Sequence, residues 1–387
     1  MRSSRFLTLV GLVLIVFVSQ DVWVTYSPIL TNVAQITGVS EGSIGLLAII
    51  YPIFFLILTI PVGILLDRNF KLWLTVGAVL TFASGALKIF SPDTYVWLMG
   101  FQLLGAIGQP FLLNSFTLFA STYYEKRKTM TISGLSFSMY LGTIFSLGAG
   151  EFMYSQGGLR TVFLPTAILA VIGIALFIVG ILGLERRKPD ENVSAFREMK
   201  FAVKQKNLWV LGVILGLGVA AYDNLSTWLQ PVVQTTGLGQ IAGTVVALTL
   251  ILGLIGILII PNIITRRDLR TSYLRVVTIA VFLIFAALAF MVSKLSLYIL
   301  LPLSGFIMLP AYPIIMDWIS EFYVKSRQGI ATGFMAFVSR IFSVVFTLSA
   351  LVVISSVSYY FIFLALLILG AVIFAWILPK DKTVVSA

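Results

Sequence analysis

The chain has 387 residues, of which 59% are hydrophobic and only 11% are charged, and its mean hydropathy is +1.05. Soluble proteins contain about 25% charged residues, so this composition excludes an ordinary soluble domain and indicates a polytopic membrane protein. The chain contains no Cys and no His, which excludes disulfides and thiol chemistry and leaves a zinc or haem-iron site without its usual ligands.

Apolar runs of about the ~20 residues that cross a bilayer recur along the whole chain. The first run has no small-residue cleavage site, so we interpret it as a first span and expect no cleavable signal peptide. The sequence predicts an all-α membrane protein with twelve transmembrane helices, at residues 6–33, 43–66, 72–90, 96–122, 130–150, 162–184, 208–233, 241–264, 276–293, 295–316, 330–354 and 357–378.

Basic residues are distributed very unevenly between the two sets of alternate loops. One set holds almost all of them, whereas the other holds only Lys88, Arg160 and Lys294. The positive-inside rule therefore predicts a multi-pass protein of the cell membrane with both termini in the cytoplasm. The net charge of +11 is then a topology signal and an attraction to anionic lipid head groups, and we expect no nucleic-acid partner.

One long polar stretch, residues 185–207, divides the chain into six spans and six spans. We expect an N-terminal half at 1–184, a cytoplasmic linker at 185–207 and a C-terminal half at 208–387. Part of the linker has the pattern of a short amphipathic helix lying on the cytoplasmic surface.

The two halves repeat each other's sequence at offsets of 199, 200 and 202 residues. The matched segments are Tyr124-x-Lys126-x-Lys128 with Tyr323-x-Lys325-x-Arg327, Ile60-Pro61 with Ile260-Pro261, and Asp21-x-x-x-Thr25-Tyr26 with Asp223-x-x-x-Thr227-Trp228. Two pseudo-symmetric six-helix halves resemble the plan of the major facilitator superfamily, which implies a solute site at the interface of the halves.

Three charged residues lie in the middle of predicted spans: Asp21, Asp223 and Arg340. A charge at bilayer depth is costly, so such residues usually face a cavity or a partner and carry function. Asp21 and Asp223 occupy equivalent places about fifteen residues into the first and seventh helices, and we expect them to flank the central pathway. They provide a site for a proton or an organic cation, and Arg340 is an anion site or the partner of Asp223. The alternative is a structural ion-pair network that holds helices together.

Polar and aromatic residues surround these charges. Trp23 lies close to Asp21 and to Pro28, where the helix backbone is loosened, and an aromatic beside a carboxylate can hold an alkylammonium by cation–π attraction. For most of the aromatics, packing between helices is the simpler interpretation. Further inward-facing candidates for substrate binding are Gln20, Tyr26, Gln109, Asn114, Tyr222 and Asn224.

The segment after the second span, Gly63-Ile-Leu-Leu-Asp67-Arg68-Asn-Phe-Lys71, resembles the major facilitator signature between helices 2 and 3. Phe70 stands where a Gly is usual, and Leu72 where a second basic residue is usual. The resemblance implies that Gly63, Asp67, Arg68 and Lys71 gate the carrier on the cytoplasmic side. The alternative is an ordinary basic loop.

Short segments also resemble one branch of the superfamily, the feline leukaemia virus subgroup C receptor-related transporters, or solute carrier family 49. They are Trp23-x-x-Tyr26-Ser27-x-Ile29, Gln109-Pro110-Phe111-Leu112, Leu141-Gly142-Thr143, Ser226-Thr227-x-Leu229 and Ile341-Phe342-x-x-x-Phe346-Thr347-Leu348. The resemblance implies a choline or ethanolamine carrier whose site includes Trp23 and an aromatic at Tyr222 or Asp223. Tyr140 and Arg340 stand where that family has glutamines, and a cation at Arg340 disfavours choline unless an aspartate neutralises it.

We therefore expect a secondary active carrier, working by alternating access, for a small polar or amine-bearing solute of the choline or ethanolamine type. The alternative is a proton-coupled exporter of organic anions or drugs with Arg340 as the anion site. We expect no enzyme, no catalytic residues, no metal and no cofactor, because the chain has no plausible triad and no HExxH. It also lacks a GxxxxGK[S/T] loop for ATP. The expected partners are the solute, a proton as candidate coupling ion and the lipid bilayer, with the monomer as the working unit.

Overall fold

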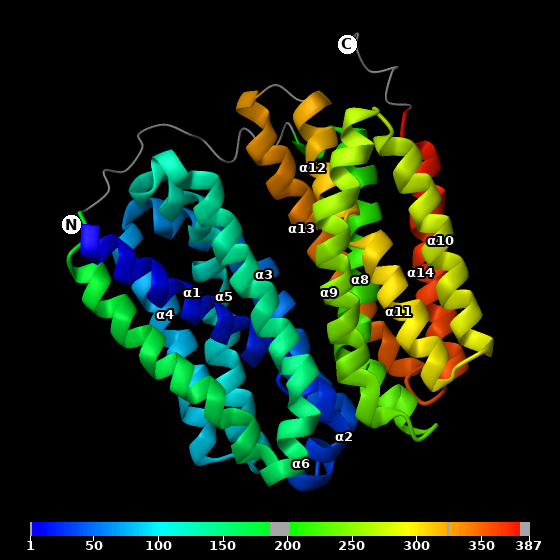
Figure 1. The fold of residues 1–387 in the computed structure, drawn as a ribbon, viewed down its shortest axis with the longest axis horizontal. Coiled ribbons are helices and arrows are strands. Elements are labelled where there is room, and N and C mark those ends of the chain that lie inside the picture. Colours follow the sequence, from blue (N-terminus) through cyan, green and yellow to red (C-terminus); the bar gives the residue numbers. More distant parts are fainter. Residues whose placement is uncertain (1, 186–201, 323–324, 380–387) are drawn as a thin grey trace. The chain divides into compact units, whose positions relative to one another are not determined.

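The structure is a computed structural model that describes residues 2–185, 202–322 and 325–379 (Figure 1). Within these ranges, eleven apolar helical segments are long enough to cross a membrane. One of them, Met130–Leu182, has 53 residues, more than twice the about 20 that one span needs. Its backbone leaves helical geometry at Gly157 and Gly158, and Gly158 has φ +69°, which favours glycine. The segment therefore holds two spans, and the predicted architecture of twelve transmembrane helices is confirmed.

The chain divides into two compact units, Met1–Asn192 and Val193–Ala387, and each is described by itself. Most of the predicted linker, including its expected amphipathic helix, falls on residues 186–201 and so lies outside the described residues. The helices of the N-terminal unit are α1 (Arg2–Val24), η1 (Ser27–Ile29), α2 (Leu30–Thr37), α3 (Glu41–Arg68), α4 (Phe70–Leu87), η2 (Lys88–Phe90), α5 (Tyr95–Tyr123), η3 (Glu125–Arg127) and α6 (Lys128–Leu182).

The C-terminal unit has the same succession of spans within its described residues. Its helices are α8 (Lys206–Gln234), α9 (Gly239–Arg266), α10 (Arg270–Phe290), α11 (Lys294–Met308), α12 (Ala311–Phe322), α13 (Lys325–Ser349), η4 (Ala350–Val352) and α14 (Val357–Ile377). Each unit has its own apolar core, built around residues such as Leu12, Leu74 and Phe119 in the first and Leu211, Trp318 and Met335 in the second.

The first span is interrupted close to its predicted functional residues. α1 ends at Val24, and a 3₁₀ turn that contains Pro28 separates it from α2. Proline lacks a backbone N–H and clashes with the preceding turn, so it breaks the helical hydrogen-bond ladder. The predicted loosening of the backbone near Pro28 is confirmed, and it places Thr25, Tyr26 and Ser27 at a helix break inside the span.

Small residues let the first span approach α6 closely. A Cβ atom at Gly142 would overlap the carbonyl oxygen of Phe17, and one at Gly180 would overlap the backbone of Thr8. Helices in membranes associate through such close contacts because lipid tails offer no hydrophobic advantage. This packing fixes the side of α1 that faces the interior of the N-terminal half.

Candidate functional site

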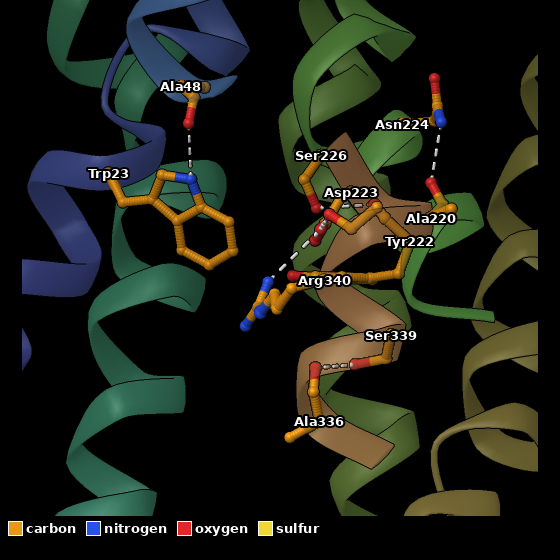
Figure 2. Close-up of polar contacts among 11 residues, drawn as sticks. Trp23, Ala48, Ala220, Tyr222, Asp223, Asn224, Ser226, Ala336, Ser339 and Arg340 are labelled. Atoms are coloured by element: carbon orange, nitrogen blue, oxygen red, sulfur yellow. Dashed lines mark hydrogen bonds and ion pairs between the residues drawn. The ribbon is translucent and has the colours of Figure 1, made fainter. Parts of the chain in front are cut away.

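The clearest polar centre of the C-terminal half is an ion pair between α8 and α13. Asp223 on α8 is buried, and its Oδ2 accepts a hydrogen bond from the hydroxyl of Ser343. Arg340 Nη1 on α13 lies 3.6 Å from the same Oδ2, as Figure 2 shows. The buried carboxylate thus has both a hydroxyl donor and an opposite charge from the neighbouring helix, as a buried charge requires.

Arg340 is more open than its partner. Its side chain is 26% exposed, whereas that of Asp223 is 5% exposed. Tyr222 extends from α8 toward the guanidinium group (Figure 2), and Tyr312 on α12 interacts electrostatically with Arg340. The C-terminal half therefore presents a partly open cation, with Tyr222 extending toward it and Tyr312 within electrostatic range.

Asn224 does not join this centre. Its Nδ2 donates to the Ala220 carbonyl of its own helix at 2.8 Å, and it lies on another side of α8 from Arg340 (Figure 2). Asn224 is fully buried, and its Oδ1 has no hydrogen-bond partner within the described part of the chain. Its position indicates packing inside the helix bundle.

In the N-terminal half, Asp21 is buried among groups from the later spans. Its Oδ2 accepts from the hydroxyl of Thr166, in the second part of α6. Its backbone carbonyl accepts from Ser146 at 3.1 Å and from Thr25 at 2.7 Å. Asp21 and Asp223 occupy equivalent sequence positions, but their carboxylates are bound by different helices of their halves.

Lys88 corrects the sequence-based assignment of loop charges. We predicted it in an outer loop, but its side chain is completely buried. Its Nζ donates to Thr25 Oγ1 at 3.2 Å, and it lies 4.7 Å from the ring centroid of Phe163 and 5.7 Å from that of Tyr26. Lys88 also interacts electrostatically with Asp21. The cation is retained inside because Asp21, a hydroxyl and two aromatic faces replace its water.

Trp23 points away from Asp21 rather than lying beside it. Its indole N–H donates to the Ala48 carbonyl on α3 at 3.0 Å (Figure 2), and its ring lies 6.4 Å from that of Tyr51. Asp21 instead contacts α6 at Thr166. Side chains two positions apart on a helix, such as Asp21 and Trp23, point in directions about 200° apart around the helix axis. A cage that combines Trp23 with Asp21 is therefore not assembled in this half.

The other two candidates on the first span, Gln20 and Tyr26, are both buried. Gln20 Nε2 and the Tyr26 hydroxyl have no hydrogen-bond partner among the residues that the structure describes. Tyr26 packs edge-on against Phe163, with ring centroids 5.9 Å apart. Both residues lie near the buried charges of this half.

The polar candidates on the fourth and fifth spans are dispersed. Gln109 is buried in α5 and Tyr140 is half-buried in α6. Asn114 is bound to one residue of α3, with its Nδ2 3.1 Å from the Thr59 carbonyl and 3.0 Å from the Thr59 hydroxyl. This pairing ties α5 to α3.

The predicted gating segment makes one well-defined contact. Lys71 Nζ donates to the carbonyl of Leu184 at 2.8 Å, at the end of the sixth span. Arg68 ends α3 in an exposed position, while the side chain of Asp67 lies outside the described part. A Cβ at Gly63 would meet no heavy atom of its own half within 4 Å. The interaction of Gly63 with the other half stays a prediction.

The C-terminal half has a related arrangement at the start of α10. Thr271, which corresponds to Lys71 at an offset of 200 residues, donates to the Pro379 carbonyl at 2.9 Å, just beyond α14. The neighbouring Arg270 is held by Asp268 at 2.7 Å and by Asp317 on α12 at 2.6 Å. In both halves the start of the third span is therefore bonded to the end of the sixth, which supports the internal repeat read from the sequence.

Sequence reasoning missed three polar partners: Lys88, Thr166 and Ser343. Lys88 is followed by two apolar residues, Ile89 and Phe90, and the predicted span 72–90 includes it, so it should not be counted with the loop charges. The two hydroxyl residues gave no such signal, because an isolated Ser or Thr is common in transmembrane helices. No group of three or more His, Cys, Asp or Glu side chains suited to a metal ion occurs in the described ranges.

Comparison with protein families identifies the family of this chain. Residues 12–347 match the Major Facilitator Superfamily. Over 187 residues, 46% of this chain, it is 29% identical to an uncharacterized protein of Archaeoglobus fulgidus, of which 84% is covered. It is 30% identical over 154 residues to the inner membrane transport protein YajR of Escherichia coli, and 24% identical over 198 residues to the multi-drug resistance efflux pump PmrA of Streptococcus pneumoniae. These last two matches cover 39% and 48% of this chain, but only 33% of YajR and 48% of PmrA.

Solved structures share the fold over nearly the whole chain. The crystal structure of a D-xylose-proton symporter superposes with a TM-score of 0.70 at 16% identity, covering 98% of both chains. The inward-facing, unoccupied structure of a bacterial homologue of the human lysosomal transporter Spinster gives 0.68 at 13% identity, covering 97% of this chain and 95% of that one. At these identities the likeness establishes the fold alone.

Proposed function

The chain belongs to the Major Facilitator Superfamily and is a multi-pass membrane transport protein, and we propose that it is a secondary active carrier for a small organic solute with a carboxylate or another acidic group. The observation that carries the proposal is the Asp223–Arg340 pair, whose cation is partly open while its carboxylate is buried. A guanidinium group suits a carboxylate because its N–H donors match the two carboxylate oxygens.

The tyrosines near Arg340 extend the proposed site. Tyr222 and Tyr312 come from α8 and α12, so three helices of the C-terminal half contribute to it. A phenol donates or accepts a hydrogen bond and presents an aromatic face, which suits the organic part of a solute. A zwitterion also fits the proposal, because a solute carboxylate that takes the place of Asp223 at Arg340 leaves the Asp223 carboxylate to pair with the ammonium group of the same solute.

A choline-like cation has less support. The predicted alkylammonium cage combines Trp23 with the nearby carboxylate of Asp21, but Asp21 is bound by Thr166 and lies near Lys88. Asp223 is already neutralised by Arg340. A quaternary ammonium entering this site would have to compete with Arg340, and the like charge would oppose it. The solute carrier family 49 branch therefore stays a prediction, and we favour an acidic or zwitterionic solute.

A thermal-shift screen of the purified protein tests the proposal. The panel contains organic acids, amino acids, choline and ethanolamine, each applied to the wild type, to Arg340→Gln and to Arg160→Gln. A ligand present at 100 times its Kd stabilises a folded protein by about 2.7 kcal/mol, so specific binding raises the unfolding temperature. We expect organic acids or amino acids to stabilise the wild type and Arg160→Gln, an exposed position that undergoes the same chemical change, but not Arg340→Gln.

Two results would contradict this proposal. Choline alone could stabilise the wild type, or an acidic solute could stabilise Arg340→Gln as well as the wild type. Stronger choline binding by Arg340→Gln than by the wild type would instead make Arg340 a selectivity residue that excludes cations.

A further inference from the structure

Asp223 receives two contacts from α13, and they differ in kind. The hydroxyl of Ser343 donates a hydrogen bond to Asp223 Oδ2. Arg340 Nη1 lies 3.6 Å from the same oxygen, which is beyond hydrogen-bond distance, so this contact is an attraction between charges. The proposed function uses Arg340 and Asp223, and it gives Ser343 no role.

The two side chains of α13 differ in exposure. Ser343 is 0% exposed, whereas the Arg340 side chain is 26% exposed. Residues three positions apart lie on the same side of a helix, so both reach Asp223 from one face of α13. The hydroxyl therefore binds the carboxylate in the interior of the half, and the guanidinium group lies nearer to the open part of the site.

The polar neighbours of Asp223 on α8 are bonded to their own helix. Asn224 Nδ2 donates to the Ala220 carbonyl at 2.8 Å, and the Ser226 hydroxyl donates to the Tyr222 carbonyl at 3.0 Å (Figure 2). The hydroxyl donor of the carboxylate comes instead from α13. One helix thus supplies both the hydrogen bond and the counter-charge of Asp223.

A solute carboxylate that binds Arg340 must draw the guanidinium group away from Asp223. A buried carboxylate that loses its partners is costly, because no water replaces them. Ser343 lowers this cost, since its hydrogen bond to Asp223 does not depend on Arg340, and hydrogen bonds to ionised groups are among the stronger ones. The ion pair can then open without leaving an unsatisfied carboxylate behind.

We propose that Ser343 is a positioning residue that allows Arg340 to exchange Asp223 for the acidic group of a solute. The proposal rests on the solute site proposed at Arg340 and deepens it. With the hydroxyl in place, charge alone holds the guanidinium group at 3.6 Å from Asp223 Oδ2. Without the hydroxyl, the guanidinium group replaces the lost hydrogen bond, and the tighter ion pair admits a solute less readily. Ser343 therefore sets the affinity of the site for acids.

The first test measures how firmly Arg340 is held, and it needs no solute. The purified protein is treated with phenylglyoxal, which modifies arginine side chains, and the modification of Arg340 is followed by mass spectrometry. We expect Arg340 to react about tenfold more slowly in Ser343→Ala than in the wild type, the lower limit of what a hydrogen bond to a charged group contributes. Arg160, which is exposed, shows in the same sample that the reagent acts equally on both proteins.

Two further variants separate the hydrogen bond from packing. Ser343→Thr keeps a hydroxyl, so Arg340 should react at the wild-type rate. Ser339→Ala is the matched control, because Ser339 is also buried in α13 but donates to the Ala336 carbonyl of its own helix at 2.8 Å (Figure 2). It should leave the rate at Arg340 unchanged. The unfolding temperature in detergent shows that each variant is folded.

The second test adds benzoate as a carboxylate probe. In the wild type, benzoate should bind Arg340 and slow its modification. The benzoate concentration that gives half of this protection should be about tenfold higher in Ser343→Ala and unchanged in Ser339→Ala. Choline chloride at the same concentration controls for salt, and it should not protect Arg340.

Two outcomes would overturn the proposal. Arg340 could react as fast in Ser343→Ala as in the wild type, which would make the hydroxyl a purely structural group whatever its effect on the unfolding temperature. Benzoate could also protect Ser343→Ala as well as the wild type. If benzoate fails to protect the wild type, this counts against the acidic-solute site of the proposed function, and the rates measured without benzoate still decide whether Ser343 loosens the ion pair. The two proposals therefore fail distinguishably.

Discussion

The two buried aspartates differ in how their charges are compensated. The counter-ion of Asp223 is Arg340, whose side chain is partly exposed. Asp21 is buried together with Lys88, whose side chain is fully buried. A charged side chain that is partly exposed can contact a solute, whereas a fully buried one can contact only a proton or a water molecule. This difference is why we place the solute site at Arg340 and not at Asp21, although the internal repeat makes the two aspartates equivalent.

The first prediction concerns the Asp223–Arg340 pair. Arg340→Gln leaves a buried carboxylate without its partner, so we expect either a destabilisation of about 3–5 kcal/mol or protonation of Asp223. Asp223→Asn combined with Arg340→Gln removes both charges and should recover much of that stability. The unfolding temperature in detergent measures both effects.

Transport separates a functional pair from a structural one. We expect the double variant to remain inactive with any solute that the thermal-shift screen identifies, because the anion site is gone. A double variant that is both stable and fully active would show that the pair is dispensable.

The second prediction concerns Trp23. Trp23→Phe retains an aromatic ring but loses the hydrogen bond to Ala48, which should cost about 1 kcal/mol. Trp23→Ala also removes the ring and its packing against Tyr51, which should lower the unfolding temperature further. Because the indole is bonded to α3 and the proposed solute site is built from α8, α12 and α13, we expect uptake of the identified solute to continue. Unfolding temperatures and uptake in proteoliposomes, together with gel filtration, check both variants. Loss of uptake by a folded Trp23→Ala would instead place the ring in the solute pathway.

At the scale of elements, close packing of α1 on α6 determines how the N-terminal half is assembled. The contact at Gly142 leaves no room for a side chain. The same contact orients α1, so it also decides that Asp21 meets Thr166 and that Trp23 meets α3. The position of Asp21 among its partners therefore depends on a glycine on a different span.

The third prediction tests this contact. Gly142→Ala places a methyl group against the carbonyl of Phe17, and we expect overpacking to cost about 1–3 kcal/mol. Gly100→Ala in α5 is the matched control, because a Cβ there meets no heavy atom within 4 Å. Unfolding temperatures of the two variants should differ clearly, with only Gly142→Ala lowered. Equal stability would mean that α1 and α6 can separate at no cost.

For the whole molecule, hydropathy predicted the twelve spans because a bilayer demands long apolar helices, and the segments matched at offsets of 199 to 202 residues predicted the internal repeat. The rotation of each helix about its axis was not predictable in this way, since spans as apolar as these carry little amphipathic signal. Asp21 was therefore paired with Trp23, and Lys88 was assigned to a loop. Asp223 and Arg340 were correctly expected as partners because the repeat places their helices in the same half.

The final prediction concerns orientation, which we propose from the loop charges. The fifth and sixth spans meet at Gly157–Gly158, so residue 155 should face the outside and residue 195, in the basic linker, the cytoplasm. The chain has no Cys, so single cysteines at these sites can be labelled in intact cells without removing others. We expect an impermeant thiol reagent to modify Ser155→Cys in intact cells, but a cysteine at 195 or at Lys126 only after the membrane is opened. Labelling of 155 and 195 from the same side would contradict the twelve-span topology with both termini in the cytoplasm.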